Sequence, residues 1–206
     1  MDKRHSNGAR VAQSTVAFLC LVTAVAAAPA LAQSEPKSLT MTIDELVTDK
    51  VIAEIREWAI VPVVTLALRS RNESAGQLEQ SEIDTLDKQW RAETESDDQP
   101  LITSVLANPL SSYLNRIQAH SVGLFTEVFV MDNKGLNVGE SDITSDYWQG
   151  DEAKWQKTFL VGPDAMFVDE VEQDESTQAL QSQASLTIAD PDSGEPIGAI
   201  TVGINL

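Results

Sequence analysis

The chain has 206 residues, and its 32 acidic side chains outnumber its 14 lysines and arginines, which gives a formal net charge of −18. A surface this acidic repels nucleic acid and anionic membranes, so we expect neither as a partner. A solvated surface that keeps the protein soluble explains most of the acidic excess.

Residues 1–32 have the pattern of a secretory signal peptide. Three basic residues precede an apolar run at 16–28, and Ala30-Leu31-Ala32 is a cleavage site of the A-x-A type. The apolar run is shorter than the roughly 20 residues that span a bilayer, so we expect no stable membrane insertion after cleavage. Cleavage after Ala32 also removes the only cysteine, Cys20, and leaves no disulfide. We therefore expect a periplasmic or secreted protein.

The rest of the chain is long enough for one domain. Residues 33–41 form a polar leader, and residues 42–206 form the predicted domain. Within it we expect a helical part at 42–120 and a sheet part at 121–206.

A long helix opens the predicted domain. Thr42 fits its N-cap, because Glu45 stands three residues later and completes a capping box. The segment Ala59–Leu68 is apolar on all sides, which predicts either that the domain encloses it or that it pairs with a partner or a second copy. Pro62 is expected to kink the helix inside this segment.

Further helices follow. Residues Asn72–Gly76 are read as a break, and a second helix is expected from Ser81, where a cap is followed by first-turn acids. A third is expected from Leu101, and Pro109 is expected to start another helical piece.

The second half of the chain predicts an antiparallel sheet. Gly135 suits the positive φ of a turn between the first two strands, and residues 174–177 and 190–194 are further turns. The expected strands are at 124–131, 136–138, 165–173, 180–188 and 196–206. The fold class predicted is α+β, with a long N-terminal helix and further helices packed on a five-stranded antiparallel sheet.

A long connection at 144–160, TSDYWQGDEAKWQKTFL, interrupts the strands and holds the aromatics Tyr147, Trp148 and Trp155 and two lysines. Aromatic faces mixed with a few polar groups line most small-molecule pockets. The alternative is that these aromatics only cap the core of the sheet.

The order of these elements resembles that of Cache domains, the PAS-like extracytoplasmic sensor modules of bacteria. The likeness rests on the hairpin VFVMDNKGLNVGESD, on the connection that ends KWQKTF, and on the closing strand GAITVGI, and it covers roughly residues 119–206. It implies a single Cache sensor domain with a PAS/Cache-like sheet. Such a domain would bind a small molecule between the sheet and the loop over it.

The resemblance also implies site residues. Lys154-Trp155 stands where amino-acid-binding relatives have an Arg–Trp element that holds a carboxylate, and Phe167-Val168-Asp169 stands where they have Tyr-x-Asp for the ammonium. Lysine lacks the two-pronged grip of arginine on a carboxylate, and phenylalanine lacks the hydroxyl. The complete amino-acid signature is therefore absent, and a small organic acid, an amine or an amino acid all remain candidate ligands.

Each candidate residue has a role and an alternative. We expect Trp148 and Trp155 to wall a cavity with Tyr147 at its rim, Lys154 to pair with an anionic group, and Asp169 to pair with a cationic one. Lys154 could instead be neutralised by a neighbouring acid, and Asp169 could face water.

Two residues on the last predicted helix, Tyr113 and Arg116, are weaker candidates for reaching the same pocket.

Signals for catalysis are weak. His120 is the only histidine after cleavage, and no nucleophile motif, phosphate-binding loop or Cys/His metal set accompanies it. Acidic turns at 132–133 and 190–195 lack the spacing of an EF-hand loop. We therefore expect no enzyme activity, no cofactor and no bound metal.

The leading hypothesis is a ligand-sensing module of signal transduction that acts without its own transmembrane output domain, through a membrane-bound signalling partner. The alternative is a structural or assembly factor that docks on a protein through Ala59–Leu68, a segment that could also form a homodimer.

Overall fold

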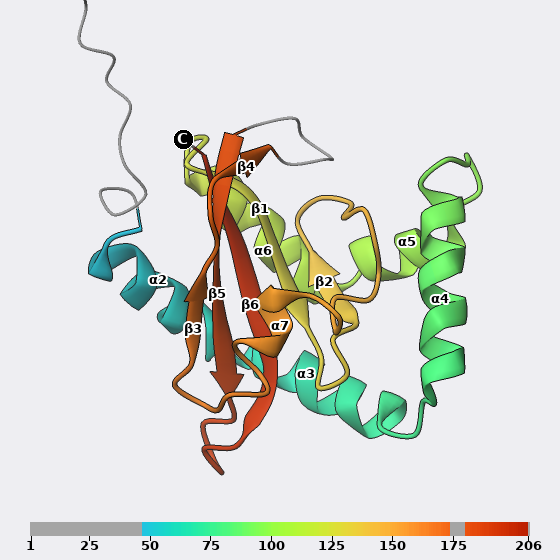
Figure 1. Cartoon of the computed structure of the whole chain (residues 1–206), viewed down its shortest axis with the longest axis horizontal. Coiled ribbons are helices and arrows are strands. Elements are labelled where there is room, and N and C mark those ends of the chain that lie inside the picture. Colours follow the sequence, from blue (N-terminus) through green and yellow to red (C-terminus); the bar gives the residue numbers. More distant parts are fainter. Residues whose placement is uncertain (1–46, 174–179, 206) are drawn as a thin grey trace, which may run out of the picture. The chain divides into compact units, whose positions relative to one another are not determined.

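Helices and an antiparallel sheet make up the part of the chain that the computed structural model describes, residues 47–173 and 180–205. The helices of this part are α2 (Asp49–Ala59), α3 (Pro62–Ala75), α4 (Gln80–Glu93), α5 (Pro100–Leu106), α6 (Pro109–His120) and α7 (Ala153–Gln156). Its strands are β1 (Phe125–Met131), β2 (Asn137–Glu140), β3 (Met166–Val168), β4 (Glu172–Gln173), β5 (Leu180–Ala189) and β6 (Pro196–Asn205) (Figure 1).

The predicted first helix is divided in two. Its expected start at Thr42 lies outside the described residues, and α2 begins after Thr48, whose hydroxyl accepts the N–H of Val51 at 3.3 Å. The expected kink at Pro62 is wrong, because α2 ends at Ala59 and Pro62 is the first residue of α3. Proline lacks the N–H that a helix interior needs, and the first turn is where this loss costs least.

The predicted break at Asn72–Gly76 is also wrong, because α3 continues through Ala75. The side chain of Asn72 forms tertiary contacts instead of a turn. Its Nδ2 donates to the carbonyl of Ile197 at 2.8 Å, and its Oδ1 accepts the N–H of Asn133 at 3.1 Å. These bonds fasten the end of α3 to the sheet.

The next helices lie close to their predicted positions. Helix α4 begins one residue before Ser81, with Glu79 as its N-cap and the N–H of Glu79 donating to Glu82 at 2.9 Å. Helix α6 starts at Pro109 as predicted, and the Asn108 side chain caps it by accepting the N–H of Ser111 at 2.8 Å.

The strands form one sheet in the order β2-β1-β6-β5-β3, with β4 also paired to β5, and every described pairing is antiparallel. The central strands β5 and β6 pair from Gln181↔Asn205 to Ala189↔Pro196. Gly135 adopts a φ of 84° in the β1–β2 turn, as the sequence predicts. The predicted α+β class, with helices packed on an antiparallel sheet, is confirmed.

The expected strand at 165–173 is shorter and divided. It forms only β3 and β4, so the sheet has a sixth, two-residue strand that the sequence did not predict. Between them, the carboxylate of Asp169 accepts the N–H of Glu170 at 2.9 Å, a local bond that competes with strand pairing. The turn expected at 174–177 lies outside the described residues.

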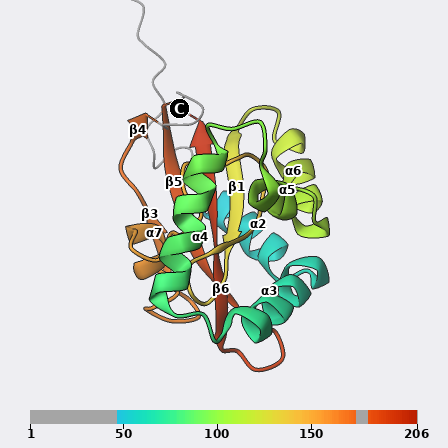
Figure 2. The ribbon, with the colours of Figure 1, turned by 90° about the vertical axis from the view of Figure 1, so that its right-hand side faces the viewer.

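One face of the sheet, which we call the helix face, is covered by α2, α3 and α6 (Figure 2). Most of its buried side chains are aliphatic, among them Val130 on β1, Ile200 on β6 and Leu186 on β5. Gly198 lets α3 approach closely, since a Cβ there would lie 2.8 Å from a methyl carbon of Leu68 and even closer to a backbone oxygen of β1. This face is the main core.

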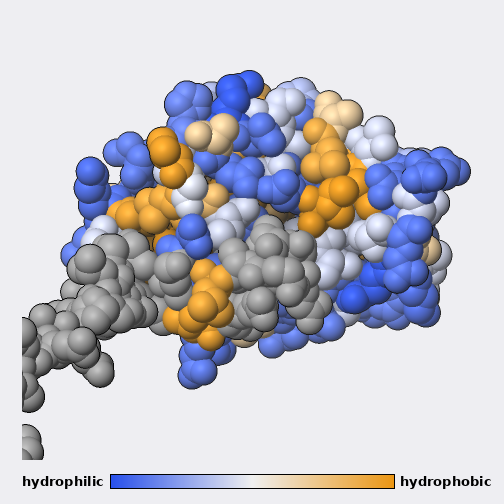
Figure 3. Space-filling view, turned by 90° about the horizontal axis from the view of Figure 1, so that it is seen from above, coloured by the Kyte–Doolittle hydropathy of each residue, from blue (hydrophilic) through white to orange (hydrophobic). Residues whose placement is uncertain are grey.

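One face of the molecule is largely hydrophilic (Figure 3). Figure 3 shows a mostly hydrophilic face on which hydrophobic side chains form separate groups. Among residues 47–173 and 180–205, no helix combines the length and the apolar character needed to cross a membrane.

Candidate ligand-binding site

The opposite face of the sheet, which we call the loop face, carries polar side chains where the helix face carries aliphatic ones. Residues that pair directly on neighbouring strands share a face. The register thus places Phe167 on β3, Ser185 on β5, Thr201 on β6 and Phe129 on β1 in one row. Ser185 and Thr201 are both fully buried, and their hydroxyl oxygens lie 3.0 Å apart.

The neighbouring row contains a buried carboxylate. Glu127 on β1 and Gln183 on β5 both pair with Gly203 on β6. Because Gly203 has no side chain, the amide of Gln183 reaches across β6 and donates to Glu127 Oε1 at 2.8 Å. Gln181 donates to the same oxygen at 3.0 Å. The row thus holds a buried carboxyl group whose Oε1 accepts two amide N–H groups.

Two buried oxygens on the loop face have no hydrogen-bond partner among the described residues. They are Oε1 of Gln183 and Oγ1 of Thr187, whose residues are only 5% and 4% exposed. Leaving a buried acceptor unpaired costs free energy, so such atoms are commonly satisfied by water or a ligand. Gln183 therefore offers a hydrogen-bond acceptor next to the carboxylate of Glu127.

Helix α7 lies over the loop face and contacts β5 (Figure 1). Its Trp155 is buried, donates its indole N–H to the carbonyl of Asp132 at 3.1 Å, and stacks on Phe159 with 5.1 Å between ring centroids. Trp155 also packs in one cluster with Phe129 and Met131. An apolar wall thus adjoins the polar rows.

Lys154 brings a positive charge to this wall. Its Nζ lies 5.5 Å from the centroid of the Phe129 ring and 2.8 Å from the carboxylate of Glu152, and only 14% of its side chain is exposed. Burial raises the pKa of Glu152, while the attraction of Lys154 lowers it. The pairing with a neighbouring acid that the sequence offered as an alternative for Lys154 is therefore present.

The β3 segment adds Phe167 and Asp169 to the loop face. Nζ of Lys157 lies 4.0 Å from the centroid of the Phe167 ring. The backbone N–H of Asp169 donates to the carbonyl of Gln183 at 2.9 Å, and its side chain is partly exposed. The structure thus gathers Lys154, Trp155, Phe167 and Asp169 around one face of the sheet.

Tyr147 and Trp148 lie elsewhere, in a hydrophobic cluster beneath α4 and α5. Tyr147 is 3% exposed and stacks on Trp90, with 5.2 Å between ring centroids. Trp148 donates its indole N–H to the carbonyl of Lys134 at 2.8 Å. Trp148 and Trp155 do line one cavity, of about 560 Å³, between the start of α4 and the β1–β2 turn, away from the polar rows.

Tyr113 and Arg116 also lie away from the loop face. Both line a cavity of about 310 Å³ between α2 and α6, together with Trp58 and His120. Tyr113 packs against the core of the helix face, and burial raises the pKa of its hydroxyl. The sheet separates these two side chains from Lys154 and Asp169.

The edge strand β2 holds a second buried carboxyl, Glu140, which pairs in register with Phe129. It is 1% exposed, and burial raises its pKa to about 8. Its Oε2 accepts bonds from Asn137 Nδ2 at 3.2 Å and from the Thr144 hydroxyl at 3.1 Å. With that pKa the group is mostly an uncharged acid at neutral pH, and it links β2 to the connection that follows.

Sequence reasoning missed the residues that make the loop face polar, above all Glu127, Gln183 and Thr201. The signal was present in the segment QSQASLT, where a polar residue recurs at every second position of a central strand. A strand that is buried on both faces normally reads as a continuous apolar run. The polar alternation therefore indicated a buried polar face.

No group of three or more His, Cys, Asp or Glu side chains suited to a metal occurs among the described residues. The acidic turn after β5 is an ion-pair site instead. Arg69 on α3 contacts Asp190 and Asp192, each at 2.6 Å, and its guanidinium lowers the pKa of Asp190 to about 2.

No protein-family model and no curated protein matches the chain. Solved structures with a similar fold include the extracellular domain of a protein described as a histidine kinase, rpHK1S-Z16. It is 13% identical, with 76% of this chain and 58% of that chain covered and a TM-score of 0.40. The ligand-binding domain of the Campylobacter jejuni chemoreceptor Tlp3, in complex with 4-methylisoleucine, is 16% identical, with 80% and 64% covered and a TM-score of 0.38.

The sensor domain of Escherichia coli DcuS is 17% identical, with 59% of this chain and 90% of that chain covered and a TM-score of 0.36. The chain spans 58% and 64% of the lengths of the first two structures. By their descriptions, these three structures are an extracellular domain, a ligand-binding domain and a sensor domain. The site described above is defined by the geometry of this chain alone.

Proposed function

We propose that the chain is an extracytoplasmic sensor module that binds a small polar molecule on the loop face of its sheet. The observation that carries the proposal is the buried polar floor formed by Glu127, Gln183, Ser185 and Thr201. A stable core would fill such a position with aliphatic side chains, as the helix face does. Polar groups that converge beside an apolar wall are the usual composition of a ligand pocket.

The charges on the loop face select the ligand class. The carboxylate of Glu127 and the open acceptor of Gln183 suit an ammonium or amide N–H, while Lys154 and Lys157 suit an acidic group. Trp155 and Phe129 offer an apolar surface between them. An amino acid or a related small molecule with an amine and an acid fits best, and a simple amine or organic acid fits in part.

The remaining parts of the proposal concern location and output. The pattern of residues 1–32 supports export followed by cleavage, which would place the domain in the periplasm or outside the cell. A binding module of this kind changes signalling only through a partner whose contacts differ between its free and bound states. We propose a membrane-bound signalling protein as that partner.

A thermal-shift screen of the purified protein against amino acids, amines and short carboxylates tests the proposal. A ligand at 100 times its Kd stabilises the folded state by about 2.7 kcal/mol, which is readily measured. The stabilisation should be lost in Glu127→Gln and Lys154→Gln, and it should persist in Arg116→Gln, which lies on the other side of the sheet. If Arg116→Gln abolished stabilisation by the ligand while Glu127→Gln and Lys154→Gln both kept it, this site would be refuted.

A second function is supported by a separate observation. Within the apolar segment Ala59–Leu68, Ile60 and Leu66 are 56% and 60% exposed, although Ala59, Val64 and Leu68 are buried. The segment is therefore only partly enclosed. We keep as the alternative an assembly factor, or a homodimer, that uses these two side chains. Cross-linking of the protein with and without Ile60→Ser distinguishes this alternative from a monomeric binding module.

A further inference from the structure

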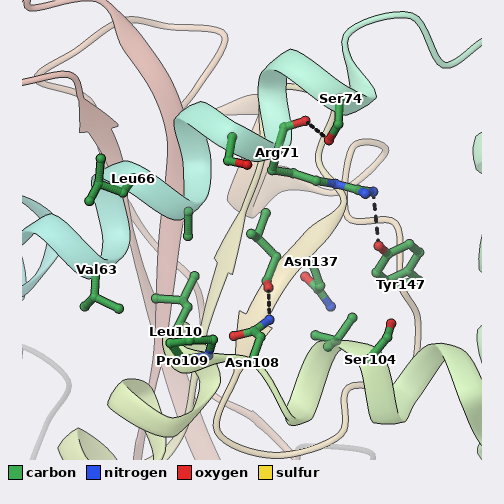
Figure 4. A pocket seen from close by; sticks show the side chains of 14 residues that line it. Val63, Leu66, Arg71, Ser74, Ser104, Asn108, Pro109, Leu110, Asn137 and Tyr147 are labelled. Atoms are coloured by element: carbon green, nitrogen blue, oxygen red, sulfur yellow. Dashed lines mark hydrogen bonds between the residues drawn. The ribbon is translucent and has the colours of Figure 1, made fainter.

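A pocket on the helix side of the sheet combines one positive charge with an apolar end. It has a volume of about 550 Å³ and lies between α3, α5, α6 and β2. Figure 4 shows Arg71 reaching from α3 to Tyr147 at one end, while Val63, Leu66 and Leu110 lie at the other. Of the described residues that line the pocket, Arg71 is the only charged one. An arginine among otherwise uncharged lining residues suits an anionic ligand group.

The guanidinium of Arg71 is fixed along one edge and open along the other. Its Nε donates to Asp132 at 3.2 Å, and its Nη2 donates to the Tyr147 hydroxyl at 3.1 Å. These two donors share one edge of the planar group. Nη1 has no partner among the described residues, and together with Nη2 it forms the outer edge. Two parallel N–H groups on such an edge match the two oxygens of a carboxylate.

Two further residues that line the pocket have hydrogen-bonding capacity without a partner in the described part of the chain. Tyr147 accepts the bond from Arg71, and its own O–H has no acceptor there. Asn137 is 1% exposed, and its Oδ1 is unpaired although its Nδ2 donates to Thr144 at 2.8 Å. Buried polar atoms left open at the positive end of a pocket suit a polar head group and the water that accompanies it.

We propose that this pocket is a second ligand site, which binds an amphipathic monocarboxylate. The carboxylate bonds to the outer edge of Arg71, and the alkyl chain lies along Val63, Leu66 and Ala67. Leu66 is 60% exposed without a ligand, and its burial under an alkyl chain contributes to binding. The proposal is independent of the loop-face site, because the two sites share no residue.

Calorimetric titration of the purified protein with sodium octanoate tests this proposal. Acetate has the same head without the chain, and octylamine has the same chain with a positive head. We expect saturable binding of octanoate and at least roughly tenfold weaker binding of both comparison compounds. Octylamine loses a charged hydrogen-bond pair, which is worth about that factor, and acetate loses the burial of the alkyl chain. Equal binding of octylamine would show that the pocket only collects alkyl chains and would overturn the proposal.

Variants locate the binding. Arg71→Gln removes the charge and should abolish octanoate binding, but it also releases Asp132 and could impair folding. Ala67→Leu leaves every contact of Arg71 in place and fills the apolar end, so it should weaken octanoate binding in a folded protein. Unchanged binding in folded Ala67→Leu overturns the proposal. So does loss of binding in the loop-face double variant Ser185→Ala/Thr201→Val, which we expect to bind octanoate normally.

Discussion

The two faces of the sheet are buried to a similar extent but have opposite chemistry. Ile200 and Thr201 are consecutive residues of β6, and both are fully buried. The isoleucine points into the aliphatic core under α2, α3 and α6, whereas the threonine bonds to Ser185 on the loop face. Alternate side chains of the same strand thus pack in the aliphatic core and line the polar loop face.

This division has an energetic meaning. Burial of an aliphatic side chain stabilises the fold directly, at about 25 cal/mol for each Å² removed from water. Burial of a hydroxyl or an amide destabilises the fold unless its hydrogen bonds are made, and even then the net free energy gained is small. The loop face therefore contributes little net stability for its size, and a polar face of this kind is most readily explained by a ligand that it binds.

The largest effect is expected from the helix face. Ile200→Ala should lower the free energy of unfolding by about 4 kcal/mol, because it removes buried methyl groups and leaves a cavity that the packed helices fill only in part. Urea denaturation measures this change. A loss below about 1 kcal/mol would mean that the helix face is loosely packed, and the contrast between the faces would fail.

A smaller effect is expected at Glu140, whose pKa is about 8 in the folded protein against an ordinary value of 4.5. Between these values the folded state holds a proton that the unfolded state has lost, so stability falls as the pH rises from about 4.5 to about 8. Glu140→Gln keeps the shape and removes the titration. At pH 8.5 this substitution should raise the free energy of unfolding by roughly 2 kcal/mol. The gain is smaller than the whole stability that the wild type loses through the pKa shift, because the new amide restores only part of it.

Unfolding curves of both proteins at pH 5, 7 and 8.5 check this expectation. The difference between wild type and Glu140→Gln should widen steadily with pH. A difference that is constant across the range would show that the carboxyl does not titrate there and that Glu140 is an ordinary buried hydrogen-bond partner.

The fold could be predicted from the sequence wherever a local pattern decides it. Helix α4 follows from the spacing of Ile83, Leu86 and Trp90, and the β1–β2 turn follows from Gly135. The prediction failed where distant contacts override local preference. Asn72 looks like a helix breaker, but its side chain bonds to Ile197 and Asn133 and is accommodated inside α3.

The candidate site could be predicted only in part, for a related reason. Lys154, Trp155, Phe167 and Asp169 were placed near the sheet by their resemblance to a known arrangement. Tyr147 was assigned to the pocket because it is an aromatic in the same connection. Its stacking on Trp90 depends on how α4 packs, and no spacing within the connection reveals that. Spatial partners far apart in the chain remain invisible to a local pattern.

A still smaller change in stability, with a large change in binding, is expected on the loop face. Ser185→Ala/Thr201→Val replaces both partners of one hydrogen bond by apolar groups of nearly the same shape. Such paired replacements are often close to neutral, so the free energy of unfolding should change by less than about 1 kcal/mol. The affinity for a ligand found in the screen should nevertheless fall by roughly tenfold, as the polar floor is lost.

Thr201→Val alone is the matched control. It leaves the buried Ser185 hydroxyl without its partner and should therefore be less stable than the double variant, by about 1 kcal/mol. Calorimetric titration and denaturation of the same samples separate the two effects. If the double variant retained full affinity, the loop-face floor would have no part in recognition, and the buried hydroxyls would be structural.

The smallest change is expected at the exposed apolar side chains of the Ala59–Leu68 segment. Ile60→Ser should alter the free energy of unfolding by no more than about 0.5 kcal/mol, because 56% of the residue is already in contact with water. Val64→Ser, in the same segment but fully buried, is the contrasting variant and should cost several times more.

Sedimentation of Ile60→Ser at several concentrations then reports on association without interference from folding. If Ile60 contacts only water in the wild type, the sedimentation distribution of Ile60→Ser will match that of the wild type. If the wild type is a dimer and this variant shifts towards monomer, the segment is an interface between two copies. That interface would then be a third buried surface, beside the two faces of the sheet.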